Sequence, residues 1–494
     1  MSTGQIALIG TLALPVVGAI GTAAAPARYD KVARIAGTAV AGLTLLASLL
    51  LLTGGKPVAG RTDAIRPWHD VDVPWVPALD LRFHLGVDGV SYPLIVLTAL
   101  LTLLCCGYTV WKVPEPGRGR LLVSLLLTVE LGILGVFASL DLILFFVFFE
   151  IVLLPMYTII AVWGGERRRS AARKFVLYTL FGSVLLLVGV FVVVAKAGTA
   201  DIVDLTGGDA LPRNTQLLAF TLLALAFAVK SPLWPLHTWL PDAHTEAPTV
   251  GSVVLAGVLL KMGTYGLLRI GVGVTPEGAA WAAPVVATLA VAAILIGGLV
   301  CLAQTELKRL IAYSSVGHMG FVVLGIASLT ATGAQAALIG NVAHGIITGL
   351  LFFLAGAVKD RAHTGRLADL GGLRETAPGL AGILGYAAIA SLGLPGLAGF
   401  WGEAFAVVAA LQRGWTALAV LAAIGGALAA AYFLRLLRRV THGPAVGPRL
   451  PALAGAELLS WGPLVVLALV LGLLPAAVLS LSAAAAVALS EVAR

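Results

Sequence analysis

The chain alternates between long apolar runs and short segments that hold most of its charged residues. A helix needs about 20 consecutive apolar residues to cross a bilayer core about 30 Å thick. We count about fourteen runs that meet this requirement, at 4–23, 33–53, 90–112, 121–139, 141–163, 174–196, 216–244, 250–270, 281–302, 310–328, 334–357, 378–412, 415–434 and 459–483. The largest segment between them is the loop 53–89. The pattern therefore predicts an all-α polytopic membrane protein, with residues 1–494 forming a single membrane domain.

Composition supports this prediction and excludes an ordinary water-soluble enzyme. Of the 494 residues, 59% are hydrophobic and 11% are charged, and the mean hydropathy is +1.00. Soluble globular proteins carry about 25% charged residues. The three cysteines, Cys105, Cys106 and Cys301, lie within apolar runs and form no Cys-x-x-Cys pair. They give no reason to expect an iron–sulfur cluster, a zinc site or a disulfide.

The first apolar run resembles a secretory signal in one respect, since Ala23, Ala24 and Ala25 follow it. However, no basic residue precedes the run, and Pro26 occupies the position where cleavage would occur. We therefore interpret it as a membrane span.

The basic residues predict how the chain is oriented. Lys and Arg number 32 against 24 Asp and Glu, a formal net charge of +8. Most of them fall in the loops after odd-numbered spans, and cytoplasmic loops are enriched in such residues. We therefore expect those loops in the cytoplasm and both termini outside. The run Arg167–Arg169 is interpreted as a lipid-headgroup anchor rather than a nucleic-acid site.

Several ionisable side chains lie inside the apolar runs, where a charged group costs about 2.5 to 3.5 kcal/mol on insertion scales. They are Glu130, Glu150, Lys230, Lys261, His318, His344 and Glu403. None would be stable facing lipid, so we interpret them together as a buried polar path.

Two of the spans should be broken near charged residues. Lys230 precedes Ser-Pro-Leu-Trp-Pro, and proline interrupts a helix because it lacks the backbone N–H donor. Lys230 then ends a half-helix, where the negative end of the helix dipole favours a cation. The twelfth span carries the segment Gly-Leu-Pro-Gly-Leu-Ala-Gly at 393–399. We expect Glu403 in the first turn of the following half-helix, where the positive dipole end favours an anion.

Two of the charges should lie near the middle of the membrane. Glu150 is about nine residues into its span, close to the midplane at 1.5 Å per residue. It is either a partner for a lysine elsewhere in the membrane or a protonated acid bonded to the backbone. Lys261 is about eleven residues into the eighth span, with no helix break beside it, which makes snorkelling to an interface an unfavourable alternative. Such a lysine is suited to proton exchange near neutral pH.

The histidines allow two interpretations. His318 and His344 suit a relay between Lys261 and Glu403, because imidazole titrates near neutrality; each is equally well explained as a hydrogen-bonded packing residue. His237, Asp242 and His244 resemble a metal-ligand set. Their spacing and the intervening Pro241 give no single-helix geometry for a metal, so we expect no metal site.

The charges and breaks also suggest an internal repeat. Glu150 and the broken span of Lys230 have counterparts in His318 and the broken span of Glu403, at similar separations. An odd number of spans separates the two breaks, which predicts inverted repeats at 121–270 and 281–434. Inverted repeats with broken helices at the midplane are typical of secondary transporters.

One stretch resembles a known family closely. Residues 235–266 read PLHTWLPDAHTEAPTVGSVVLAGVLLKMGTYG. This resembles the signature of the antiporter-like subunits of proton-pumping NADH:quinone oxidoreductase, respiratory complex I, and the resemblance covers nearly the whole chain. The wider superfamily includes subunits of multisubunit sodium/proton antiporters and membrane-bound hydrogenases. Within it, the chain is most similar to the subunit M type, called subunit 4 in mitochondria. Glu403 stands where related subunits usually carry lysine, and the chain ends soon after its last span.

The resemblance implies roles for the buried charges. Glu150 and Lys230 would be an interacting pair, Lys261 the central relay and Glu403 the outlet group, with His318, His344 and Glu130 on the same polar axis. The chain would move protons from the cytoplasm outward, without a cofactor of its own, while quinone is reduced on other subunits.

The resemblance also implies partners and location. The partners would be neighbouring antiporter-like chains, L and N, in the membrane arm, the redox-arm subunits indirectly, and the lipid bilayer, without nucleic acid. The location would be the bacterial inner membrane. The alternative is a subunit of a sodium/proton antiporter or a membrane-bound hydrogenase.

Overall fold

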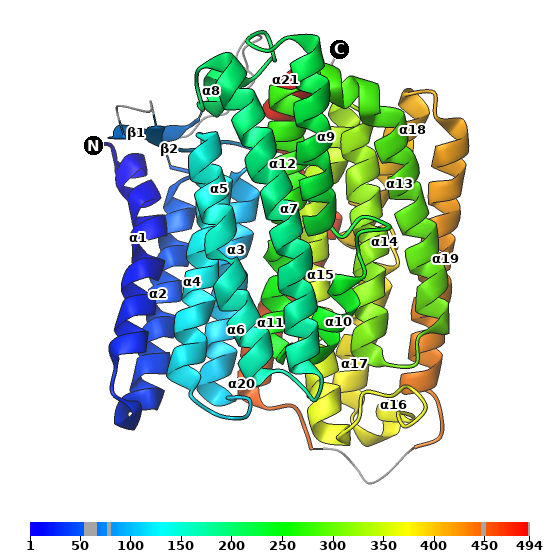
Figure 1. Cartoon of the computed structure of the whole chain (residues 1–494). Helices are drawn as coiled ribbons and strands as arrows, with labels where there is room; N and C mark the ends of the chain where they lie inside the picture. Colours follow the sequence, from blue (N-terminus) through cyan, green and yellow to red (C-terminus); the bar gives the residue numbers. More distant parts are fainter. Residues whose placement is uncertain (54–66, 77–80, 446–450, 493–494) are drawn as a thin grey trace.

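The computed structural model describes residues 1–53, 67–76, 81–445 and 451–492, and it is an almost entirely helical bundle (Figure 1). Among the described residues, twelve helical segments are long and apolar enough to cross a membrane, counting the consecutive elements of Leu142–Trp163 and of Thr249–Val272 as one segment each. The first half contains α1 (Thr3–Ala24), α2 (Asp30–Leu50), α3 (Tyr92–Trp111), α4 (Gly119–Ala138), α5 (Leu142–Ile151), α6 (Leu153–Trp163), α7 (Arg168–Ala197), α8 (Ile202–Leu205), α9 (Arg213–Lys230) and α10 (Trp239–Glu246).

The second half follows the same pattern of long and divided helices. It contains α11 (Thr249–Val254), η3 (Leu255–Leu259), α12 (Lys261–Gly266), η4 (Leu267–Val272), α13 (Pro276–Ala303), α14 (Leu307–Ala327), α15 (Ala331–Ala362), α16 (Leu373–Thr376), α17 (Pro378–Ser391), α18 (Gly399–Gln412), α19 (Thr416–Val440), α20 (Gly455–Leu473) and α21 (Ala476–Val492). The start of α1 and the helix α21 lie at the same end of the bundle, which we call the terminal face; the loops after α6 and α15 lie at the opposite face (Figure 1).

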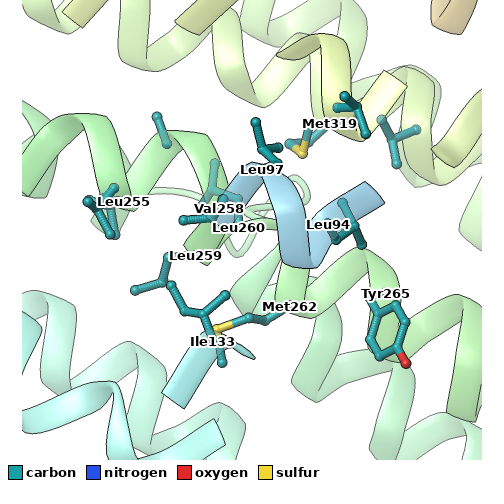
Figure 2. Close-up of a cluster of buried hydrophobic side chains, with 14 of the residues drawn as sticks. Leu94, Leu97, Ile133, Leu255, Val258, Leu259, Leu260, Met262, Tyr265 and Met319 are labelled. Atoms are coloured by element: carbon teal, nitrogen blue, oxygen red, sulfur yellow. The ribbon is translucent and has the colours of Figure 1, made fainter. Parts of the chain in front are cut away.

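The element from α11 to η4 forms the centre of the bundle. Residues 250–276 are all buried, so this span contacts protein on every side. Its surroundings are largely apolar: Leu94 and Leu97 of α3, Ile133 of α4 and Met319 of α14 gather around its leucine and methionine side chains (Figure 2). Charged side chains on this span are therefore shielded from lipid.

Both expected helix breaks are confirmed. α9 ends at Lys230, and helix resumes only at Trp239. α17 ends at Ser391 and α18 begins at Gly399, with Gly393 and Gly396 between them at φ of 77° and 93°. Glycine adopts this left-handed conformation without the steric strain that a side chain would cause. The two predicted spans 216–244 and 378–412 are thus each divided into two shorter helices.

The position expected for Glu403 within its half-helix is wrong. α18 begins at Gly399, so Glu403 is beyond the first turn, which contains no acidic residue. The helix dipole acts mainly within the first turn. Glu403 is instead held by a histidine, as described below.

Other boundaries also differ from the prediction. The helix of the fifth span is interrupted at Val152, because Pro155 cannot donate to the carbonyl of Ile151. The predicted span 459–483 is divided: α20 ends at Leu473 and α21 begins at Ala476. Leu474 precedes Pro475 and has non-helical angles, as residues before proline prefer. The proposed inverted repeats stay a prediction.

The loop 53–89 contains a hairpin that the sequence did not predict; its residues 54–66 and 77–80 lie outside the described part. β1 (His69–Val76) pairs antiparallel with β2 (Leu81–Val87) at the terminal face. His84 Nδ1 lies 2.7 Å from Asp201 Oδ2, at the start of α8, and so fastens the hairpin to the bundle.

This contact is sensitive to pH. Burial alone would lower the pKa of His84, but the hydrogen bond and charge of Asp201, helped by Asp72 and Asp70, outweigh it and raise the pKa. For Asp201, burial acts to raise the pKa, and the contact with His84 lowers it overall.

Candidate functional site

Lys230 and Glu150 lie near each other without forming an ion pair. Lys230 is 2% exposed, and its ammonium lies 4.5 Å from the centroid of the Phe149 ring, next to Glu150 on α5. A cation over an aromatic face is attracted by the negative face of the ring. The Glu150 carboxylate interacts electrostatically with Lys230. Both residues belong to the described part, yet no ion pair within 4.0 Å joins them, and Glu150 Oε1 is buried without a hydrogen-bond partner.

Lys261 is fully buried at the centre of the bundle. It begins α12, and π-helical segments lie on both sides of it, η3 before and η4 after. The sequence suggested an uninterrupted helix here. π-helical segments occur often at functional sites. The Lys261 ammonium lies 2.5 Å from the carbonyl oxygen of Ala256, in η3, and 2.6 Å from Nδ1 of His344 on α15.

The contact between Lys261 and His344 permits proton exchange. Either the ammonium donates to a neutral imidazole, or a neutral amine accepts from the ring, depending on where the proton resides. The other ring nitrogen of His344, Nε2, is buried without a hydrogen-bond partner. It is therefore available to pass a proton onward.

His318 continues this chain toward Glu403. Its ring lies 5.8 Å from that of His344, centroid to centroid. Nδ1 of His318 lies 2.9 Å from Oε1 of Glu403, and Nε2 lies 3.1 Å from the hydroxyl of Ser391, the last residue of α17. Lys261, His344, His318 and Glu403 are thus successive neighbours, with hydrogen bonds at both ends and a ring contact between the two histidines. We call them the Lys–His–His–Glu series.

A small cavity of about 30 Å³ borders the second half of this series. Its wall includes both histidine rings, Ser391 and Glu403. These four polar side chains offer hydrogen-bond partners to a water molecule in a cavity whose wall is otherwise mostly apolar.

The helix α18 approaches α15 very closely beside the cavity. A Cβ atom on Gly402 would lie 2.6 Å from the Cα of Gly340, so a larger residue would push α18 away. This backbone contact fixes where Glu403 stands relative to His318.

Glu130 stands apart from these residues. It is fully buried on α4, and neither of its carboxylate oxygens has a hydrogen-bond partner. No ion pair joins it to the other six expected residues, all of which are described. Its place on the path stays a prediction.

Two buried basic residues were not predicted. His244, on α10, is fully buried with both ring nitrogens unpartnered, its ring stacked at 4.5 Å on Phe352. Lys308 is buried on α14 and donates to the carbonyl of Ala247 at 2.9 Å. His244 interacts electrostatically with both Lys308 and Lys261, so it lies between the opposite face and the central lysine. His244 was considered only as a metal ligand, and Lys308 stood just outside the expected span 310–328.

The possible metal-ligand set is dispersed. Asp242 forms ion pairs with Lys174 at 2.7 Å and with Arg309 at 3.4 Å. His237 packs its ring against Tyr313, away from the stacked ring of His244. Within the described residues, no group of three His, Cys, Asp or Glu side chains is arranged to hold a metal ion.

A family model described as the NADH:quinone oxidoreductase/Mrp antiporter transmembrane region matches residues 139–429, more than half of the chain. The chain belongs to this family. The matched region contains Glu150, Lys230 and the whole Lys–His–His–Glu series, and it excludes Glu130. The resemblance seen in residues 235–266 is thereby confirmed.

Similar proteins narrow the relationship within the family. NADH-quinone oxidoreductase subunit M of Rhodobacter capsulatus is 40% identical over 492 residues, covering 96% of this chain and 94% of that protein. NAD(P)H-quinone oxidoreductase chain 4 3 of Trichormus variabilis is 38% identical over 445 residues, covering 88% of this chain and 81% of that protein.

Solved structures agree with this relationship. A chain of respiratory complex I from Thermus thermophilus superposes with a TM-score of 0.88 at 33% identity, covering 99% of this chain and all of that one. A chain of the Mrp complex from Dietzia sp. DQ12-45-1b gives 0.85 at 23% identity, with 99% and 98% covered. At 23% identity, the similarity to the Mrp chain shows a shared fold and nothing more.

Proposed function

We propose that this chain is the M-type proton-translocating subunit of NADH:quinone oxidoreductase, and that protons pass through its buried charges. The observation that carries the proposal is the Lys–His–His–Glu series, in which each side chain lies next to the following one. The relatives of subunit M type support the assignment to this complex, and they favour it over a sodium/proton antiporter or a membrane-bound hydrogenase.

In this proposal the chain carries no redox centre and is driven by its neighbours. Other membrane-arm subunits, of the L and N type, would lie against it in the bilayer, and the redox arm would act through them. The chain would lie in a bacterial inner membrane with both termini outside, so that protons enter at the opposite face, which is rich in Lys and Arg. Labelling of single cysteines placed before α1 and in the loop after α15, from each side of the membrane, tests that orientation.

Glu150 and Lys230 would act as the switch at the start of the path. At an effective dielectric constant of 20, two unit charges attract by about 4 kcal/mol at about 4 Å and about 2 kcal/mol at about 8 Å. Opening or closing this pair therefore supplies about 2 kcal/mol. A proton crossing about 150 mV needs about 3.5 kcal/mol. One pair is insufficient, which is a physical reason for several charges in series.

Lys261 would receive the proton next and pass it to His344 on the neighbouring helix α15, parallel to the membrane plane. Its contact with His344 leads through His318 to Glu403, along the cavity between α15, α17 and α18. Water in that cavity would bridge the two histidine rings, because both nitrogens of His318 are bonded to Glu403 and Ser391 and no hydrogen bond joins the rings directly.

The variant His344→Phe tests this route, because it keeps an aromatic ring and removes both proton-carrying nitrogens. The complete complex is purified, reconstituted in vesicles and supplied with NADH and quinone, and protons translocated per electron are measured. We expect a clear drop, with assembly intact. His363→Phe is the matched control, since His363 is an exposed histidine at the end of the same helix. Normal stoichiometry in His344→Phe would refute the route through His344.

A further inference from the structure

A buried ion pair lies on the central span beyond Lys261. Nη2 of Arg269, in η4, is 2.6 Å and 2.5 Å from the two carboxylate oxygens of Asp88, which precedes α3. Arg269 is 1% exposed and Asp88 is 5% exposed. None of the proton-carrying steps above uses this pair.

Neighbouring groups hold the pair in place. Asp88 Oδ1 accepts hydrogen bonds from the backbone N–H groups of Val90 and Ser91. Arg269 Nε donates to the hydroxyl of Tyr265 at 3.2 Å, and that hydroxyl donates to the carbonyl of Phe137. The remaining nitrogen, Nη1, is buried without a partner among the described residues.

The pair lies between Lys261 and the terminal face. Arg269 is eight residues beyond Lys261 on the same span, roughly 12 Å along a helix. α21 lies at this end of the bundle (Figure 1), and a Cβ on Gly273 would lie 3.6 Å from Cδ2 of Leu489 on that helix. Contact there is tight: a Cβ on Gly89, next to Asp88, would overlap the carbonyl oxygen of Leu481. On the Lys261 side of the pair along the chain, Leu94 and Met262 belong to the apolar cluster around the span (Figure 2).

The chemistry of the pair is unsuited to carrying protons. Arginine stays protonated in proteins. Asp88 has its oxygens occupied by the guanidinium and two backbone donors, which favour its charged form. Neither group is free to accept and release a proton.

We propose that Asp88 and Arg269 seal the terminal end of the central span, so that Lys261 exchanges protons only sideways with His344. This inference rests on the proposed function, because it assumes that Lys261 carries protons. Without such a seal, Lys261 would have a short route along its own span to the terminal face, bypassing His318 and Glu403.

If the pair acts as a seal, two single substitutions should change the proton leak differently. Arg269→Gln leaves Asp88 without its cation, so its carboxyl group becomes able to carry protons and passive leak should rise about tenfold. Asp88→Asn leaves a fixed cation and no acid, so the leak should stay at the wild-type level. A pair with only a structural role predicts no such difference.

The measurement uses the complete complex in vesicles without NADH. A potassium gradient with valinomycin imposes a membrane potential, and a pH-sensitive dye inside the vesicles reports proton flow. Arg361→Gln is the matched control, because Arg361 forms a similar two-pronged pair with the buried Glu457 near the opposite face. It should leave the leak unchanged.

Equal leak in Arg269→Gln and Asp88→Asn, or wild-type leak in Arg269→Gln, would overturn the seal. If Arg269→Gln fails to assemble, Arg269→His takes its place, since it can pair with Asp88 and carry a proton; wild-type leak there would likewise overturn it. Adding Lys261→Met should abolish the leak, and persistence of the leak would overturn the link to Lys261. Because no turnover is involved, these outcomes are independent of the stoichiometry measured for His344→Phe.

Discussion

Replacing Lys261 by arginine separates proton exchange from positive charge. Arginine keeps the cation and its hydrogen-bond donors for Ala256 and His344, but it has a pKa above 12. At pH 7, about five units below the pKa of arginine, deprotonation costs about 1.36 kcal/mol per unit, or about 7 kcal/mol in all. The fraction of deprotonated side chain therefore falls to about one in 10⁵.

We expect Lys261→Arg to lose nearly all proton translocation while the complex still assembles. The longer side chain in a fully buried position costs about 1 to 3 kcal/mol of packing strain, which a large complex tolerates. Lys261→Met should also lose translocation. It removes two hydrogen bonds, but it also removes the penalty of a buried charge, so its thermal stability should stay near that of the wild type.

The assay is NADH-driven proton uptake per electron in reconstituted vesicles, with the melting temperature of the complex measured alongside. Lys112→Arg is the control, since Lys112 forms a partly exposed ion pair with Asp360 and should tolerate arginine. Wild-type stoichiometry in Lys261→Arg would refute the proposal that Lys261 releases protons. Failure of the Lys112→Arg control would mean that arginine itself harms the complex.

Three further outcomes are expected. Glu150→Ala and Lys230→Ala should preserve assembly and abolish most proton translocation, since each removes one charge of the switch; unchanged protons per electron in vesicles would contradict this role. Glu403→Lys should be tolerated better than Glu403→Ala, because a titratable group persists beside the neighbouring imidazole, and equal loss of translocation in the two variants would count against a relay role there. The contact of His84 with Asp201 should be strongest between about pH 4 and about pH 6.5: the raised pKa of His84 gives stabilisation that is lost as pH rises through it, and the lowered pKa of Asp201 gives stabilisation that is lost as pH falls through it. Protection of the β2 amides, measured as their exchange rate relative to an unstructured peptide at the same pH, should therefore fall above this range, and His84→Gln should remove that fall.

The sequence predicted the features that depend on local chemistry. The break after Lys230 follows from two nearby prolines, and the break at 392–398 follows from two glycines and a proline. The long apolar runs identified the spans in the same way. In each case a few neighbouring residues determine the backbone, without help from distant parts of the chain.

Features that depend on contacts between distant residues could not be predicted from the sequence. Asp88 and Arg269 are 181 positions apart, and nothing local marks them as partners. Lys308 is buried because α14 begins at Leu307 and brings the lysine against the carbonyl of Ala247 at the end of α10, a contact 61 positions away in the sequence. The π-helical segments beside Lys261 likewise depend on packing, since their residues are ordinary for any membrane helix.

Because residues 250–276 are completely buried, their apolar side chains have a different role from those of a lipid-facing span. A span in contact with lipid must be apolar to be stable in the bilayer, but the rest of the chain shields this one from lipid. Its leucines and valines instead form part of a surrounding of low dielectric constant for Lys261, whose ammonium contacts the His344 ring. Substitutions that make this span more polar should therefore affect the tightness of coupling before they affect membrane insertion.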